Sequence, residues 1–146
     1  MDVTERRDRF RSLHSTGTFV VPNPFDRGSA RLLEAVGAQA LATTSAGLAF
    51  SRGRPDMGID RDTLLGHVAD LVDGVDLPIH VDAERGFADD PGGVADTVHA
   101  LAHAGAAGCS IEDWDPALSR IDPFDEAVLR VAAAAAAARD HGLVLT

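Results

Sequence analysis

Lysine is absent from this 146-residue chain, and all 13 of its basic residues are arginines. Enzymes that form a Schiff base with their substrate, pyridoxal-phosphate enzymes and P-loop nucleotidases each depend on a lysine. The sequence therefore excludes these three kinds of chemistry before any motif is considered.

Cysteine and long apolar runs are also scarce. Cys109 is the only cysteine, which excludes a disulfide within the chain, and no Cys/His cluster around it points to structural zinc. No apolar run approaches the roughly 20 residues of a membrane helix. The charged start Met1–Arg7 is not followed by a signal-peptide core. We therefore expect a cytoplasmic protein with no membrane partner.

Negative charge dominates the chain, which has a formal net charge of -10 at pH 7. This balance disfavours nucleic acid and anionic membrane surfaces as partners. It does not exclude a small anionic substrate, because a metal ion and backbone dipoles can bind one locally. The length suits one domain with a core large enough to fold without disulfides or structural metal.

Apolar runs and helix-start signals alternate along the chain at close to the 30-residue βαβ period, which indicates a parallel sheet covered by helices. The glycine-rich G-x-G-x-x-G turn of dinucleotide-binding folds is missing, and Pro22-Asn23-Pro24 stands in its place. A doubly wound open sheet and a (β/α)₈ barrel both fit. The barrel fits better, so we predict an α/β fold: the first half, about five strands, of a TIM (β/α)₈ barrel.

The pattern also predicts where these elements lie. We expect a polar leader helix within residues 1–16, and a partial barrel over residues 17–146, truncated at its fifth strand. Residues 45–59 are expected to form a loop. The expected strands are 19–21, 38–43, 77–82, 107–111 and 143–145. The expected helix signals are start caps at Asp26, Asp60, Asp90 and Asp122 and a stop at Gly142.

Acidic residues stand at the ends of two successive predicted strands. Asp82 and Glu84 end one, and Glu112 ends the next. Alternate residues of a strand share a face, so parallel neighbouring strands would bring these three carboxylates to one edge of the sheet. Carboxylates that close repel each other unless a cation neutralises them. Oxygen ligands without Cys or His suit Mg²⁺ or Mn²⁺, so we predict a divalent-metal site.

Other reactive side chains have two possible roles each. Cys109 has the opposite parity to Glu112 and should face the helices as a small buried hydrophobe, and His80 should point into the barrel interior. His99 and His103 have the i, i+4 spacing of a transition-metal pair but more simply lie on a solvated helix face. Arg85 could attract an anionic substrate or could simply be solvated.

The order of motifs resembles the isocitrate lyase/phosphoenolpyruvate mutase family of metal-dependent barrels. The matching stretches are Val21–Asp26 with Ser29-Ala30-Arg31, Ala42–Ala49, Gly53–Asp56, Asp82–Phe87 and Gly108–Asp113. The resemblance implies a Mg²⁺-dependent lyase or phosphomutase that acts on small 2-oxo acids. Such enzymes cleave C–C or P–C bonds through an enolpyruvate intermediate held on the metal.

The resemblance also implies roles for individual residues. Asp82 looks like the direct metal ligand, and Glu84 and Glu112 look like ligands that act through metal-bound waters. Ser45, Ala46 and Gly47 fall where the family binds its substrate; there the N–H groups of Ala46 and Gly47 would face the carboxylate and oxyanion. Asp56 falls in the mobile loop that supplies a catalytic carboxylate.

Two departures from the family pattern matter. The Lys-Lys/Arg-Cys-Gly-His segment of isocitrate and methylisocitrate lyases is missing after the fourth strand, which favours the short-loop, phosphoenolpyruvate mutase-like branch. The chain also ends at Thr146, before an arginine that the family uses on its substrate. We therefore expect an N-terminal half, incomplete as an enzyme, which self-associates as a homo-oligomer.

Two alternatives stay open at this point. One is another Mg²⁺ barrel with an acidic pair, similar to ketopantoate hydroxymethyltransferase. The other is a non-catalytic half-barrel that only self-associates.

Overall fold

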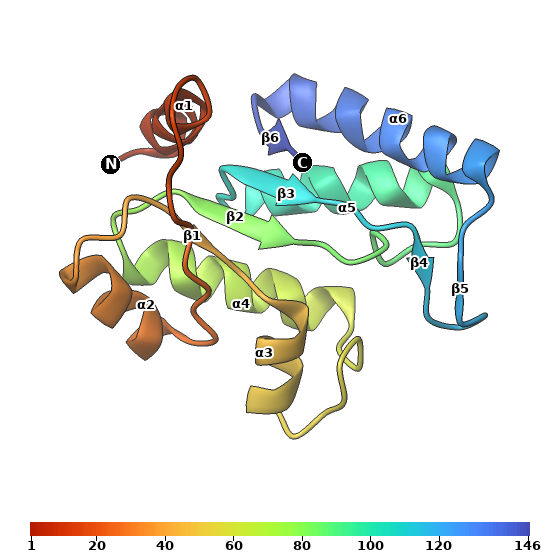
Figure 1. The fold of residues 1–146 in the computed structure, drawn as a ribbon, viewed down its shortest axis with the longest axis horizontal. Coiled ribbons are helices and arrows are strands. Elements are labelled where there is room, and N and C mark those ends of the chain that lie inside the picture. Colours follow the sequence, from red (N-terminus) through yellow and green to blue (C-terminus); the bar gives the residue numbers. More distant parts are fainter.

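The computed structural model describes all 146 residues as an α/β fold, with helices packed on a parallel sheet (Figure 1). No helix is both long and apolar enough to pass through a membrane. The elements in chain order are α1 (Val3–Leu13), α2 (Arg27–Ala35), β1 (Leu41–Ala42), α3 (Ser45–Ser51), α4 (Arg61–Gly74), β2 (Ile79–Asp82), α5 (Pro91–His103), β3 (Gly108–Ser110), β4 (Trp114–Asp115), β5 (Arg120–Ile121), α6 (Phe124–His141) and β6 (Val144–Leu145).

The main sheet has four strands in the order β1-β2-β3-β6, and each neighbouring pair is parallel. Strand order follows chain order, as in the first units of a (β/α)₈ barrel. The predicted α/β class is therefore confirmed. Beyond the carboxyl ends of β2 and β3, β4 and β5 form a small antiparallel hairpin. The division into residues 1–16 and 17–146 stays a prediction.

Residues 19–21 do not form the predicted first strand. The segment runs beside β1, and the Ala42 N–H donates to Pro22 O at 3.1 Å. Pro22 and Pro24 have no N–H to donate in return, so a strand ladder cannot develop there. Val20 accordingly lies 79% exposed. The sheet has four strands where the sequence indicated about five.

Three of the four predicted helix caps are confirmed. The side chains of Asp26, Asp60 and Asp90 each accept a hydrogen bond from the backbone N–H three residues later. Gly142 ends α6 in the left-handed conformation, with φ of 70°. Asp122 is the exception, because α6 has no side-chain cap. Its carboxylate binds arginine instead, a charge-assisted bond stronger than one to a neutral N–H.

The first part of the predicted loop 45–59 is a helix, α3. Thr44 caps it by accepting the Gly47 N–H at 3.2 Å, and its Leu48 and Ala49 are buried in the core. Apart from Gly47, the glycines and arginines that suggested a loop lie after Ser51. The loop itself therefore spans residues 52–60.

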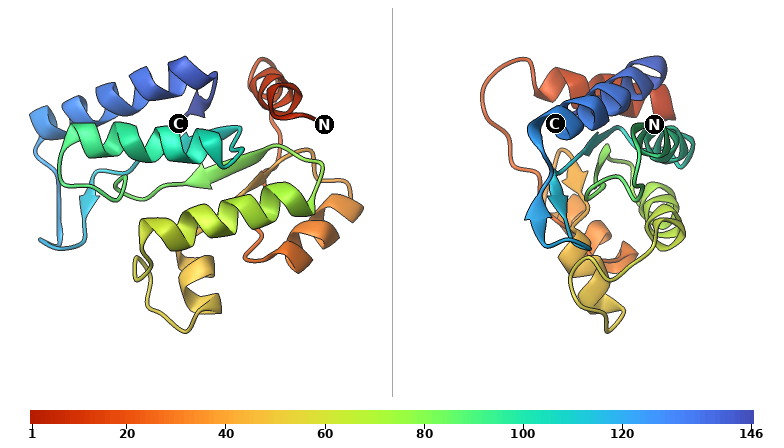
Figure 2. Two further views of the ribbon diagram at one scale, coloured as in Figure 1. Left: turned by 180° about the vertical axis from the view of Figure 1, so that it is seen from behind. Right: turned by 90° about the vertical axis from the view of Figure 1, so that its right-hand side faces the viewer.

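The core lies between the sheet and the outer helices α4, α5 and α6. Seen from behind, α4 and α5 lie in front of the sheet (Figure 2). Ile79, Val81 and Cys109 face this side and are fully buried. The predicted orientation of Cys109 is confirmed, and burial raises the pKa of its thiol to about 12.

The opposite face of the sheet is closed at its amino end by α1. Phe10 packs there with Ala40 and Ala107, and its ring lies 5.5 Å from the ring of His80. Burial lowers the pKa of His80 to about 4. Arg7 ties α1 to this end of the sheet, because its guanidinium donates to the main-chain oxygens of Ala102, Ala106 and His141.

The expectation that both α5 histidines are solvated is wrong for one of them. His99 Nδ1 lies 2.8 Å from His141 Nε2 of α6, and the two rings meet edge-on. His103 is exposed. The contact joins the carboxyl-terminal halves of α5 and α6, which the sequence did not place side by side.

Replacing Gly108 with Ala should destabilise the fold. A Cβ atom at this position would lie 2.6 Å from Val144 O and 2.8 Å from both Phe10 Cε1 and His80 Nδ1. None of these atoms can move freely, so we expect the free energy of unfolding to fall by about 1–3 kcal/mol. Urea denaturation measures it.

Gly66→Ala is the matched control, because a Cβ atom on this α4 residue meets nothing within 4 Å. This substitution should raise the free energy of unfolding by about 0.5–1 kcal/mol. Equal effects of the two substitutions would contradict the close packing at Gly108.

Candidate metal and substrate site

The parallel register of β2 and β3 brings the two acidic strand ends together. Asp82 is the last residue of β2 and is aligned with Ser110 of β3. Glu84 lies two residues beyond Asp82 and Glu112 two residues beyond Ser110, and the Glu112 N–H donates to Glu84 O at 2.8 Å. The segments that bear the three predicted ligands are therefore joined directly, backbone to backbone.

Three hydrogen bonds fix Asp82, two with the stretch that joins β1 to α3 and one with its own segment. Its two carboxylate oxygens accept the Ser45 N–H at 3.0 Å and the Glu84 N–H at 3.2 Å. Its own N–H donates to Thr43 Oγ1 at 2.9 Å. This carboxylate consequently has one orientation, at the point where α3 meets the end of β2.

Glu84 is the most unusual group of the site. The residue is 5% exposed, and its Oε1 atom is buried with no hydrogen-bond partner. Desolvation first, and then the negative charges of Asp82, Asp56 and Glu112, raise the pKa of Glu84 to about 7. A buried carboxylate without a partner is costly, and a bound cation would remove that cost.

Glu112 and Asp56 complete the negative cluster. Partial desolvation, followed by repulsion from Asp82, Asp56 and Asp113, raises the pKa of Glu112. Asp56 lies in the exposed loop after α3, where Ser45 Oγ donates to its carboxylate at 3.5 Å and the Met57 N–H at 2.9 Å. Asp56 is therefore close to the predicted ligands, although its loop is remote from them in sequence.

The predicted substrate donors lie on the first turn of α3. The Ser45 N–H bonds Asp82 and the Gly47 N–H bonds Thr44 Oγ1. Ala46 is the second residue of the helix, and such an N–H has no partner within the helix. Substrate binding by Ser45, Ala46 and Gly47 stays a prediction.

The donor set suits a hard divalent cation. It consists of carboxylate oxygens, and the groups that shift the pKa of Glu84 include no positive side chain. No three Asp, Glu, His or Cys side chains are gathered into a ligand set by themselves. Mg²⁺ usually keeps several of its waters and takes few protein ligands directly, so such a set is not required. Asp82, Glu84 and Glu112 fit this ion, and their ligand roles stay a prediction.

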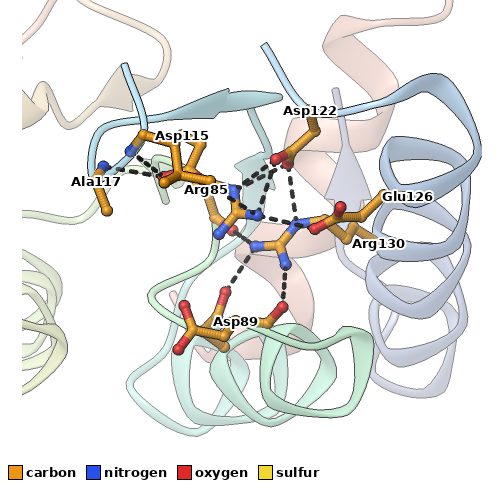
Figure 3. A network of polar contacts seen from close by, with 9 residues as sticks. Arg85, Asp89, Asp115, Ala117, Asp122, Glu126 and Arg130 are labelled. Carbon is orange, nitrogen blue, oxygen red and sulfur yellow. Dashed lines mark hydrogen bonds and ion pairs between the residues drawn. The ribbon is translucent and has the colours of Figure 1, made fainter. Parts of the chain in front are cut away.

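A buried ion network beside the site was not foreseen from the sequence. Arg85 is neither free to attract substrate nor solvated, because its guanidinium donates to Asp122 and Glu126 (Figure 3). Arg130 of α6 lies behind it, 1% exposed. A cavity of about 220 Å³ opens between Glu84, Arg85 and the β4–β5 hairpin. The one sequence signal that could have indicated this network was Arg130, an arginine among the small residues of α6.

Comparison with known proteins identifies the family to which this arrangement belongs. The model of the phosphoenolpyruvate phosphomutase family matches residues 10–146, nearly the whole chain. The chain belongs to the phosphoenolpyruvate mutase/isocitrate lyase family. The predicted resemblance is thereby confirmed, and so is the reading of the parallel sheet as part of a barrel of this family.

Relatives of this family match the chain over about half of their own length. The 2-methylisocitrate lyase of Escherichia coli (strain K12) is 36% identical over 115 residues, which are 70% of this chain and 39% of that protein. A Burkholderia cenocepacia J2315 structure, provisionally described as a lyase/mutase, is 50% identical with a TM-score of 0.94 and covers 98% of this chain and 53% of its own.

Oxaloacetate acetylhydrolase, solved in complex with its product oxalate, is 28% identical with a TM-score of 0.87. The match covers 95% of this chain and 51% of that one. Family members thus include enzymes named as lyases, mutases and hydrolases.

Replacing Glu84 with Gln should stabilise the chain when a chelator removes divalent ions. In the folded chain the pKa of Glu84 is about 7, above its ordinary 4.5, so ionised Glu84 opposes folding at pH 8. We expect the free energy of unfolding to rise by about 2 kcal/mol at pH 8. The difference should shrink as the pH falls from 7 to 4.5 and vanish below it, because Glu84 then becomes protonated in both states.

Urea denaturation at pH 8 and at pH 4.5 measures this difference. Glu112→Gln is the control: it removes a carboxylate of the same cluster that is exposed, so its effect should be smaller. A Glu84→Gln protein that is less stable than the parent at pH 8 would contradict the unpaired state of this carboxylate.

Proposed function

We propose that this chain provides the metal- and substrate-binding half of a Mg²⁺- or Mn²⁺-dependent enzyme that breaks or forms a C–C or P–C bond in a small anionic 2-oxo acid. The observation behind this proposal is the buried, partnerless oxygen of Glu84 among the carboxylates of Asp82, Asp56 and Glu112. Family membership favours 2-oxo acids over the ketopantoate hydroxymethyltransferase-like alternative.

Each residue has a separate task in this proposal. Asp82, held by the Ser45 and Glu84 N–H groups, would bind the ion directly. Glu84 and Glu112 would hold its waters. When bound, the divalent ion would act as a Lewis acid toward the 2-oxo group. The N–H of Ala46 would point to the substrate carboxylate, and Asp56 would move a proton at the mouth of the site.

Assembly of the chain is a separate expectation. β6 forms an edge of the sheet, and α6 exposes the apolar side chains of Phe124, Val128, Leu129 and Val131. Open strand edges and exposed apolar surface both favour association. The predicted homo-oligomer and the cytoplasmic location stay predictions.

Oxalate, a small dianion that mimics enolpyruvate, should bind more tightly in the presence of Mg²⁺. We expect saturating Mg²⁺ to lower the dissociation constant of oxalate at least about tenfold, because the two ligands contact each other at one site. Asp82→Ala should abolish this effect. Isothermal titration calorimetry with and without Mg²⁺ measures it.

Asp96→Ala is the control, since it removes an exposed carboxylate on α5 outside the acidic cluster. It should leave the Mg²⁺ effect unchanged. Oxalate binding that is independent of Mg²⁺ would refute the proposed site and favour the non-catalytic half-barrel. A Mg²⁺ effect that survives Asp82→Ala would refute Asp82 as the direct ligand.

A further inference from the structure

One buried guanidinium holds the segment that follows β2. Arg130 donates to the main-chain oxygens of Arg85, Ala88 and Asp89 (Figure 3). The segment 85–89 has no strand partner of its own. Arg130 therefore supplies the hydrogen bonds that a sheet neighbour would otherwise provide.

The backbone that Arg130 holds is intrinsically unfavourable. Glu84 has φ of 48° and Phe87 has φ of 54°, both in the left-handed region. Residues with a side chain rarely adopt this conformation, so the surroundings must enforce it. Because Glu84 directly precedes the segment, whatever fixes the segment also restricts the direction in which the Glu84 side chain leaves the backbone.

Asp122 links Arg130 to the second acidic strand end. Its carboxylate accepts from Arg85 Nε at 2.9 Å and lies 3.5 Å from Arg130 Nε. Its backbone N–H donates to Asp113 O at 2.7 Å. Asp113 directly follows Glu112. The network is thus attached to both segments that present the predicted ligands.

The network also engages the arginine next to the site in the sequence. Arg85 directly follows Glu84, yet its guanidinium contacts Asp122 at 2.8 Å and Glu126 at 3.0 Å. Asp115 lies 3.8 Å away on the third side. Glu84 Oε1 is left without a partner. Arg85 and Arg130 thus pair with the carboxylates of the network. The predicted metal ligands have no arginine partner, so only a cation from solution would neutralise them.

We propose that Arg130 is a positioning residue for the candidate metal site, acting through the Arg85–Asp89 backbone on Glu84 and through Asp122 on Glu112. The inference rests on the proposed function, since it assigns a task within that site. Residues that orient metal ligands without binding the ion typically change metal affinity 10–100-fold.

Arg130→Lys is the test, because lysine keeps the charge but cannot reach three carbonyls with a planar fork. The quantity measured is the factor by which saturating Mg²⁺ tightens oxalate binding to the 146-residue chain, at a temperature where each variant is folded. We expect this factor to fall at least about tenfold.

Arg7→Lys is the matched control. Arg7 also binds three main-chain oxygens, at the opposite end of the sheet. Arg7→Lys should lower the melting temperature about as much as Arg130→Lys does, and it should leave the Mg²⁺ factor unchanged. Equal losses of the factor in the two variants, or no loss in Arg130→Lys, would overturn the positioning role.

Asp122→Asn serves if Arg130→Lys does not fold. It keeps the size of the side chain and weakens its contacts with both arginines, and we expect at least about a threefold loss of the Mg²⁺ factor. An unchanged factor in this variant would equally overturn the proposal.

Amide hydrogen exchange separates this inference from the proposed function. If the parent chain shows no Mg²⁺ effect on oxalate, the proposed function fails, and exchange of the Glu112 amide, which donates to Glu84 O, decides the positioning role alone. Faster exchange of this amide in Arg130→Lys than in Arg7→Lys supports the role, and equal exchange overturns it.

Discussion

Uncompensated negative charge at the carboxyl ends of two parallel strands is the constraint on which the candidate site depends. The register of β2 and β3 leaves no freedom to separate these ends, because the Glu112 N–H bonds Glu84 O at 2.8 Å. Repulsion and desolvation together raise the pKa of Glu84 to about 7. A fold that keeps such a group without a partner gains stability whenever a cation binds there, since binding to the folded state alone stabilises it.

The arginines show that this charge is not a by-product of an acidic chain. Arg7 binds main-chain oxygens at the amino end of the sheet, and Arg130 does so at the carboxyl end. At the carboxyl end, Asp122 accepts from Arg85 and lies beside Arg130, whereas Asp82 and Glu84 receive no arginine. The carboxylates that form ion pairs with arginine thus lie next to the candidate metal ligands, but they are different residues.

Local patterns were enough to predict the features that depend on a single element. Strand parity placed Cys109 toward the helices, and short-range signals located the caps at Asp26, Asp60 and Asp90. The wrong predictions concern features that depend on contacts with residues distant in the sequence. Asp122 has the same sequence signal as Asp90, but Arg85, 37 positions away, binds its carboxylate. Residues 19–21 have strand character, yet the prolines that follow prevent pairing. Nothing local predicts the Arg130 contacts either.

The β4–β5 hairpin narrows the choice of acid and base within this chain. It follows β3 directly and contains neither cysteine nor histidine. Its buried carboxylate, Asp115, accepts the N–H groups of Ala117 and Leu118, so it is committed to the turn of the hairpin. Asp82 is likewise fixed by backbone donors. Asp56 is exposed, as Glu112 is, and lies on the loop of residues 52–60. The catalytic role of Asp56 stays a prediction, and its exposed position beside the predicted ligands is compatible with it.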